Sequence, residues 1–134
     1  MKVLVDTSVW SLALRKQAAV PGDLKAGSVL SELIRDLRVE MIGPIRQEIL
    51  SGISDPVKFQ NLKERISPFS DIEIITEDYE RAAQFSNECK RNGIQGSHTD
   101  FLICSVSVRL NLMIFTLDAN FKEYLRFLPI RLFE

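Results

Sequence analysis

Four acidic side chains stand beside apolar segments, where an unpaired carboxylate is unfavourable. Asp6 and Asp118 each follow an apolar run, Asp100 precedes another, and Glu48 lies within an apolar helical stretch. Two unit charges about 4 Å apart repel by roughly 4 kcal/mol at an effective dielectric constant of about 20. If the four carboxylates converge, they must therefore take up protons or bind a divalent cation.

The ligand chemistry of such a site is set by the residue types. A set of oxygen ligands without His or Cys favours Mg²⁺ or Mn²⁺ over zinc. Each acid also has a purely structural alternative. Asp100 completes an [ST]-x-x-[DE] capping box with Ser97, Asp6 can cap the following helix, Asp118 can hold a turn, and Glu48 can be solvated or paired with Arg46. One shared site accounts for all four positions together.

Short apolar runs alternate with amphipathic stretches along the chain. The predicted strands cover residues 3–5, 39–42, 73–75, 112–115 and 130–132. The predicted helices cover approximately residues 9–16, 26–38, 43–50, 56–66, 76–92 and 99–110, with a turn at 21–23. This alternation predicts an α/β fold, a three-layer α/β/α sandwich with a mostly parallel central sheet.

The predicted sheet brings distant acids together. Ligands of parallel α/β folds bind beyond the carboxyl ends of the strands. Asp6 follows the first strand and Asp118 follows the strand at 112–115, so both are expected at the same edge. A length of 134 residues is that of one domain, and we expect a single domain over residues 1–134.

The composition excludes several classes of protein. With 46% hydrophobic residues the chain can build a core, which excludes disorder. Its longest uncharged stretches, 101–108 and 110–117, are far shorter than the roughly 18 residues of a membrane-spanning helix, and we expect a cytoplasmic protein. The net charge of -1 gives no overall basic field, although acids neutralised in a metal site would leave a more basic surface. Cys89 and Cys104 are expected to be reduced core thiols.

Taken in order, four segments resemble the PIN-domain nucleases. They are Val5-Asp6-Thr7-Ser8-Val9, Arg46-Gln47-Glu48-Ile49-Leu50, Asp100-Phe101-Leu102-Ile103 and Thr116-Leu117-Asp118-Ala119-Asn120-Phe121. Within that family the chain is most similar to VapC-type toxins of toxin–antitoxin pairs. The resemblance implies a metal-dependent endoribonuclease with Mg²⁺ or Mn²⁺ in an acidic pocket, a homodimer, and inhibition by a small cognate antitoxin.

The resemblance also assigns roles to residues. Asp6 and Asp100 would be direct metal ligands, and Glu48 and Asp118 would complete the acidic ring. Thr116 would support the pocket. The hydroxyls of Thr7 and Ser8 would hydrogen-bond a carboxylate or the scissile phosphate. Some members of the family have another acid where this chain has Asn120, so a second metal position is less well supported.

The RNA contacts are less clearly marked in the sequence. The candidates for contact with the RNA backbone are Arg15, Lys16, Arg46, Lys90, Arg91 and Arg109, but ordinary solvated roles are favoured for them. A loop or capping role is favoured for His98 over phosphate contact. Trp10 is expected in the core or at a subunit interface rather than stacked on a base.

Three other functions compete with this interpretation. A phosphohydrolase of the haloacid-dehalogenase type needs Asp-x-Asp after its first strand, and this chain has Asp6-Thr7-Ser8. A receiver domain needs an adjacent acidic pair and a Lys after the last strand, which are not found. A degenerate PIN fold that only binds protein is the remaining alternative, and retention of all four acids argues against it.

Overall fold

A computed structural model describes residues 1–14 and 21–134. Its strands are β1 (Val3–Val5), β2 (Val39–Glu40) and β3 (Met113–Phe115). Its helices are α1 (Thr7–Leu14), α2 (Pro21–Arg35), α3 (Gly43–Leu50), α4 (Pro56–Ile66), α5 (Thr76–Arg91), α6 (His98–Leu110) and α7 (Asn120–Leu125). Arg15 and Lys16, including the predicted end of the first helix, lie outside the described residues.

The sheet has three parallel strands in the order β2-β1-β3. Val3 pairs with Val39 on one side and with Met113 on the other. The side chains of the central strand are 0% exposed, as expected for a parallel strand covered on both faces. The prediction of a parallel sheet is therefore confirmed.

One predicted strand is reduced to a single bridge, and another is not formed. Met41 bridges to Asp71, and Ile114 bridges to Leu132, both in parallel orientation. In residues 73–75, backbone groups form hydrogen bonds with side chains and not with a neighbouring strand. The Glu73 carbonyl accepts from Arg109 at 3.0 Å, and the Ile75 N–H donates to Asp78 at 3.1 Å. The strand prediction at 73–75 is therefore wrong, and the prediction at 130–132 is correct only for the bridge at Leu132.

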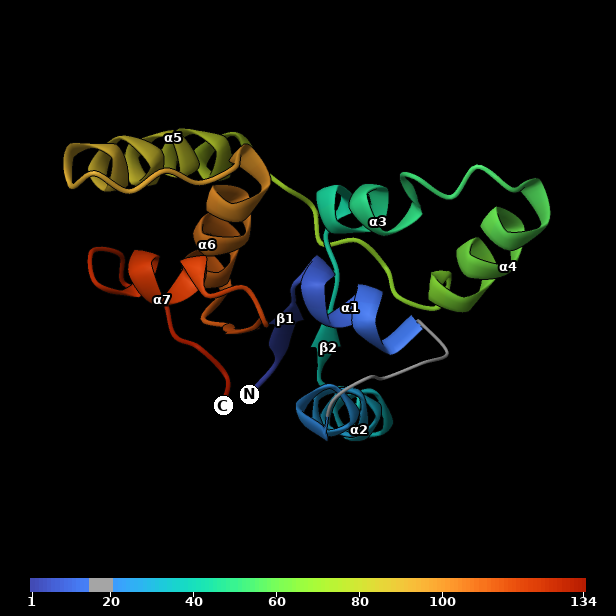
Figure 1. Cartoon of the computed structure of the whole chain (residues 1–134). Coiled ribbons are helices and arrows are strands. Elements are labelled where there is room, and N and C mark those ends of the chain that lie inside the picture. Colours follow the sequence, from blue (N-terminus) through green and yellow to red (C-terminus); the bar gives the residue numbers. More distant parts are fainter. Residues whose placement is uncertain (15–20) are drawn as a thin grey trace.

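Helices cover the sheet on two sides (Figure 1). The helices α5, α6 and α7 lie on one side of the strands, and α1 to α4 lie on the other. This arrangement confirms the predicted α/β/α class. None of the helices in the described ranges combines the length and apolarity needed to cross a membrane. Cys89 and Cys104 are buried free thiols, as expected.

Several helix starts follow from local capping chemistry. The Asp55 carboxylate accepts from the Val57 N–H at 3.0 Å, with Pro56 as the first residue of α4. Proline is equally compatible with the first position of α2, which begins at Pro21. The predicted turn at 21–23 is therefore wrong, and α2 starts earlier than expected.

Candidate functional site

The four predicted carboxylates line one pocket beyond the carboxyl ends of β1 and β3. The pocket has a volume of about 550 Å³. Its lining residues are Asp6, Thr7, Ser8, Glu48, Ser51, Ser97, Asp100, Asp118 and Asn120. The parallel sheet thus brings acids from both ends of the sequence to a single edge.

Asp6 is the most enclosed of the four acids, with 6% of its surface exposed. Its N–H continues the β-ladder by donating to the Phe115 carbonyl at 2.8 Å. Its carboxylate oxygen Oδ2 accepts from two hydroxyls, Ser8 Oγ and Thr116 Oγ1, each at 2.8 Å. These bonds hold the carboxylate between the ends of β1 and β3.

Glu48 reaches the pocket from α3 and is solvent-exposed. The Thr7 hydroxyl at the start of α1 donates to Glu48 Oε1 at 2.7 Å. The alternative pairing of Glu48 with Arg46 is not what the structure shows, because the Arg46 guanidinium contacts Asp71 at 3.0 Å. Among the residues that the structure describes, the partner of the Glu48 carboxylate is therefore a neutral hydroxyl and not a cation.

Asp118 both lines the pocket and orders the chain that follows it. Its Oδ1 accepts from the Asn120 N–H at 2.9 Å, at the start of α7. The Asp118 N–H donates to Thr116 Oγ1 at 3.0 Å. The predicted turn role is therefore present together with the placement at the pocket.

Asp100 lies in the first turn of α6, half-buried. Its N–H donates to Ser97 Oγ at 3.1 Å, so Ser97 caps the helix as its sequence position indicates. Burial raises the pKa of the Asp100 carboxyl. Hydrogen bonds from Tyr124 and Ser97 lower that pKa in part, while the negative charges of Asp6 and Asp118 raise it further.

Sequence reasoning did not identify Ser51 in the pocket lining, nor Tyr124 and Gly96 beside Asp100. The Tyr124 hydroxyl donates to Asp100 Oδ2 at 2.6 Å, and the side chain is 0% exposed. A Cβ placed on Gly96 would lie 2.2 Å from that hydroxyl oxygen. Tyr124 lies in α7, a helix that the sequence pattern does not predict. The sequence signal for this contact is the glycine at position 96, directly before the capping residue Ser97.

The PIN domain family matches residues 3–126, which is most of the chain. The chain belongs to the PIN-domain family. No curated protein matches it. Its PIN domain is similar to the crystal structure of FitAcB from Neisseria gonorrhoeae, with a TM-score of 0.77 and 21% identity over 98% of this chain and 96% of that one.

Two further solved structures share this PIN fold. One is VapBC2 from Rickettsia felis bound to a DNA fragment from their promoter, with a TM-score of 0.78 and 17% identity over 99% of this chain and 98% of that one. The other is VapBC-1 from nontypeable Haemophilus influenzae, with a TM-score of 0.74 and 11% identity over 100% of this chain and 98% of that one. At these identities the similarity shows the fold, as the resemblance to VapC-type chains predicts.

The chemistry of this PIN pocket fits a hard divalent cation. All its ionisable ligand candidates are carboxylates, and like charges already raise the pKa of Asp100. Within residues 1–14 and 21–134, however, no three acidic, His or Cys side chains are grouped tightly enough to hold one ion directly. These facts agree if few carboxylates bind directly, since Mg²⁺ usually keeps several waters and takes one or two carboxylates.

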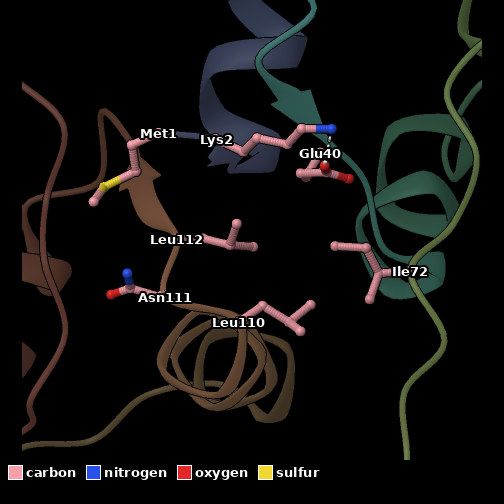
Figure 2. A pocket seen from close by; sticks show the side chains of 7 residues that line it. All are labelled: Met1, Lys2, Glu40, Ile72, Leu110, Asn111 and Leu112. Carbon is pink, nitrogen blue, oxygen red and sulfur yellow. Dashed lines mark ion pairs between the residues drawn. The ribbon is translucent and has the colours of Figure 1, made fainter.

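A second pocket, at the other end of the PIN domain's sheet, has a different character (Figure 2). It has a volume of about 400 Å³ and is lined mainly by aliphatic side chains such as Ile72, Leu110 and Leu112. Its single acid, Glu40, is paired with Lys2 at 3.2 Å. Because that carboxylate already has a cationic partner, the pocket lacks the unneutralised charge of the site above.

Three of the six basic residues considered for RNA contact have acidic partners in this PIN domain. Arg46 is bound to Asp71, Arg109 to Asp78, and Arg91 to Glu88. Trp10 is buried and packs against Phe69 with ring centroids 5.1 Å apart, so it belongs to the core. His98 is exposed and is the first residue of α6, directly after the capping residue Ser97.

Proposed function

We propose that this chain is a Mg²⁺- or Mn²⁺-dependent endoribonuclease that hydrolyses RNA phosphodiester bonds. The observation that carries the proposal is the convergence of Asp6, Glu48, Asp100 and Asp118 on one pocket of a PIN domain. Carboxylates supply no positive charge to a phosphate, so their collection in one place is useful to such a reaction through a bound cation.

Asp6 and Asp100 are the proposed direct ligands, as the resemblance to PIN-domain nucleases implies. Asp6 is the most enclosed of the four acids, and its negative charge raises the pKa of Asp100. Glu48 and Asp118 complete the acidic ring by accepting hydrogen bonds from water. The chemistry that a divalent cation supplies when bound is positive charge beside the phosphate and a lowered pKa for water.

The hydroxyls of the site position the carboxylates. Ser8 and Thr116 hold Asp6 Oδ2, and Thr7 holds Glu48 Oε1. A carboxylate restrained in this way loses less conformational entropy when it binds a cation. These three hydroxyls are therefore the proposed supporting residues.

The proposed biological role is that of a toxin in a toxin–antitoxin pair. Support comes from the similar folds, which include the VapBC2 and VapBC-1 structures. The expected partners are a small cognate antitoxin, a second copy of the chain in a homodimer, and RNA as substrate in the cytoplasm, with residues 1–134 acting as one nuclease domain. Light scattering of the purified chain tests the dimer, and copurification with the product of an adjacent reading frame tests the antitoxin.

The decisive experiment compares RNA cleavage by the wild type, Asp6→Ala and Asp100→Ala, each purified without antitoxin. Cleavage by the wild type is expected with Mg²⁺ or Mn²⁺ and is expected to stop in EDTA. Both variants should lose nearly all activity. The matched control is Asp36→Ala, which removes an exposed acid just after α2 and should cleave like the wild type.

The outcome also separates the enzyme from a PIN fold that only binds protein. A catalytic chain should show a metal-dependent rise in melting temperature that Asp6→Ala abolishes. Undiminished cleavage in both alanine variants, or a wild type that neither cleaves RNA nor responds to Mn²⁺, would reject this active site.

A further inference from the structure

We infer that Tyr124 is a positioning residue of the metal site, whose hydroxyl holds one oxygen of Asp100 so that the carboxylate binds a cation through the other. The inference rests on the proposed function, since it concerns the same pocket. It adds a residue from α7 that contacts neither RNA nor cation. The evidence is a hydrogen bond, an enclosed ring and a close backbone approach.

The hydrogen bond is short and specific to one oxygen. Tyr124 Oη donates to Asp100 Oδ2 at 2.6 Å. A hydrogen bond to an ionised acceptor is stronger than one between neutral groups. Hydrogen bonds of this kind orient carboxylate ligands at metal sites and tune their affinity.

The ring of Tyr124 is fixed by its aromatic neighbours. Its centroid lies 5.1 Å from that of Phe101 in α6 and 5.1 Å from that of Phe121 in α7. The side chain is 0% exposed. Because the ring is buried and packed against two other aromatic rings, the hydroxyl is held toward Asp100 before any ligand binds.

Gly96 provides the space that this hydroxyl occupies. A Cβ at residue 96 would lie 2.2 Å from Tyr124 Oη and 2.9 Å from Phe101 Cζ. Any side chain there would displace the hydroxyl or the ring. Gly96, before α6, therefore leaves the space for the hydroxyl, and Tyr124 of α7 supplies the hydrogen bond to Asp100.

A neutral donor suits this position better than a cationic one. The Asp100 carboxylate is partly buried beside the negative charges of Asp6 and Asp118, so it needs a donor. An Arg or Lys would neutralise the carboxylate and compete with a cation. The tyrosine hydroxyl satisfies one oxygen while the full negative charge of the pocket is retained.

The first test measures Mn²⁺ binding to the full chain by calorimetry. Tyr124→Phe removes only the hydroxyl, and Mn²⁺ affinity is expected to fall by about 10–100-fold. The matched control is Tyr79→Phe, the same change at a residue that is 55% exposed on α5, which should bind like the wild type. In an Asp100→Ala background, Tyr124→Phe should have no further effect, because the hydroxyl acts through Asp100.

The second test uses the unaltered wild-type sequence, so it does not depend on a variant that folds. The chain contains 2 tyrosines, Tyr79 and Tyr124. With tyrosine labelled by ¹³C at Cζ, addition of Mg²⁺ should shift the Tyr124 resonance and leave that of Tyr79 in place. A tyrosine that served only to pack the core would show no such response.

The outcomes separate this inference from the proposed function. If Asp6→Ala abolishes Mn²⁺ binding while Tyr124→Phe binds as tightly as the wild type, the inference is overturned and the metal site stands. The inference is likewise overturned if the wild type binds Mg²⁺ but the Tyr124 resonance does not shift. A wild type that binds neither ion overturns both.

Discussion

Ser8 and Thr116 lie 108 residues apart in the sequence, yet their hydroxyls donate to the same carboxylate oxygen, Asp6 Oδ2. Ser8 Oγ also accepts from the Leu117 N–H at 3.0 Å. The end of the first strand is therefore joined to the chain after the third by side chains as well as by the β-ladder. This joint sets the position of the most enclosed acid in the pocket.

Thr116→Val tests that joint. The substitution keeps the shape of the side chain but removes a donor to Asp6 and an acceptor for the Asp118 N–H. The free energy of unfolding is expected to fall by about 1–3 kcal/mol, the cost of unsatisfied polar groups. Urea denaturation monitored by circular dichroism measures it. Thr99→Val is the control, because no hydrogen bond of the Thr99 hydroxyl is recorded in the described part of the chain; an equal loss there would refute the argument.

Gly96→Ala tests the close approach to Tyr124. The added methyl would lie 2.2 Å from the tyrosine hydroxyl oxygen and 2.8 Å from Cζ, so stability should fall by about 1–3 kcal/mol through overpacking. Gly27→Ala in α2 has nothing within 4 Å of the new Cβ and should stabilise by about 0.5–1 kcal/mol, because alanine favours a helix. Thermal melts of the two variants should move in opposite directions.

Asp100→Asn should stabilise the metal-free protein. Burial, together with the charges of Asp6 and Asp118, raises the folded-state pKa of Asp100 above its ordinary value of 3.8. Folded protein therefore holds this proton more tightly than unfolded protein, and stability is lost as the pH rises through the folded pKa. In EDTA near neutral pH, the Asn variant should have the higher free energy of unfolding. That advantage should disappear below pH 3.8, and a wild type that is the more stable at neutral pH would contradict the charge argument.

Arg109→Met tests a structural ion pair away from the pocket. Asp78 is 2% exposed and accepts from Arg109 Nε at 2.8 Å and from a second guanidinium nitrogen at 2.9 Å. Removing the guanidinium leaves a buried charge without its partner, which typically costs about 3–5 kcal/mol. Arg91→Met breaks an exposed pair and should cost less than about 1 kcal/mol. Denaturation curves of both variants give the comparison.

The same pair predicts a dependence of stability on pH. Burial raises the pKa of Asp78, but the hydrogen bonds from Arg109 and the Ile75 N–H outweigh it, and the net pKa is below the ordinary 3.8. The stability that it contributes is present above pH 3.8 and is lost as the pH falls through the folded pKa. The gap between wild type and Arg109→Met should therefore narrow in acid. A gap that stays constant over that range would show that packing, not charge, sets the cost.

The sequence predicts elements well where local chemistry decides them. Asp55 before Pro56 and Ser97 before Asp100 are capping signals, and α4 and α6 begin there. Pro21 is ambiguous because proline suits both a turn and a first helical residue. The helix α7 has only 6 residues and too few apolar positions to show a period, so it was missed.

The same division holds for the candidate site. Asp6 and Asp118 could be placed at one edge because parallel strands end there, and both line the pocket. The contact of Tyr124 with Asp100 depends on how α7 packs against α6, which no local pattern encodes. Arg109 shows the converse, since a residue considered for RNA contact is held by an acid 31 residues away.

The site combines residues that are far apart in the sequence. Asp6 lies near the beginning, whereas Asp100, Thr116 and Asp118 lie in the last third, and they come together only in the folded chain. A nascent polypeptide that has emerged only as far as residue 99 lacks two of the four acids, Asp100 and Asp118, and also lacks the Thr116 hydroxyl that orients Asp6. Whatever reaction the pocket performs must therefore wait until the chain has been synthesised through Asp118, because no shorter nascent fragment contains all four carboxylates.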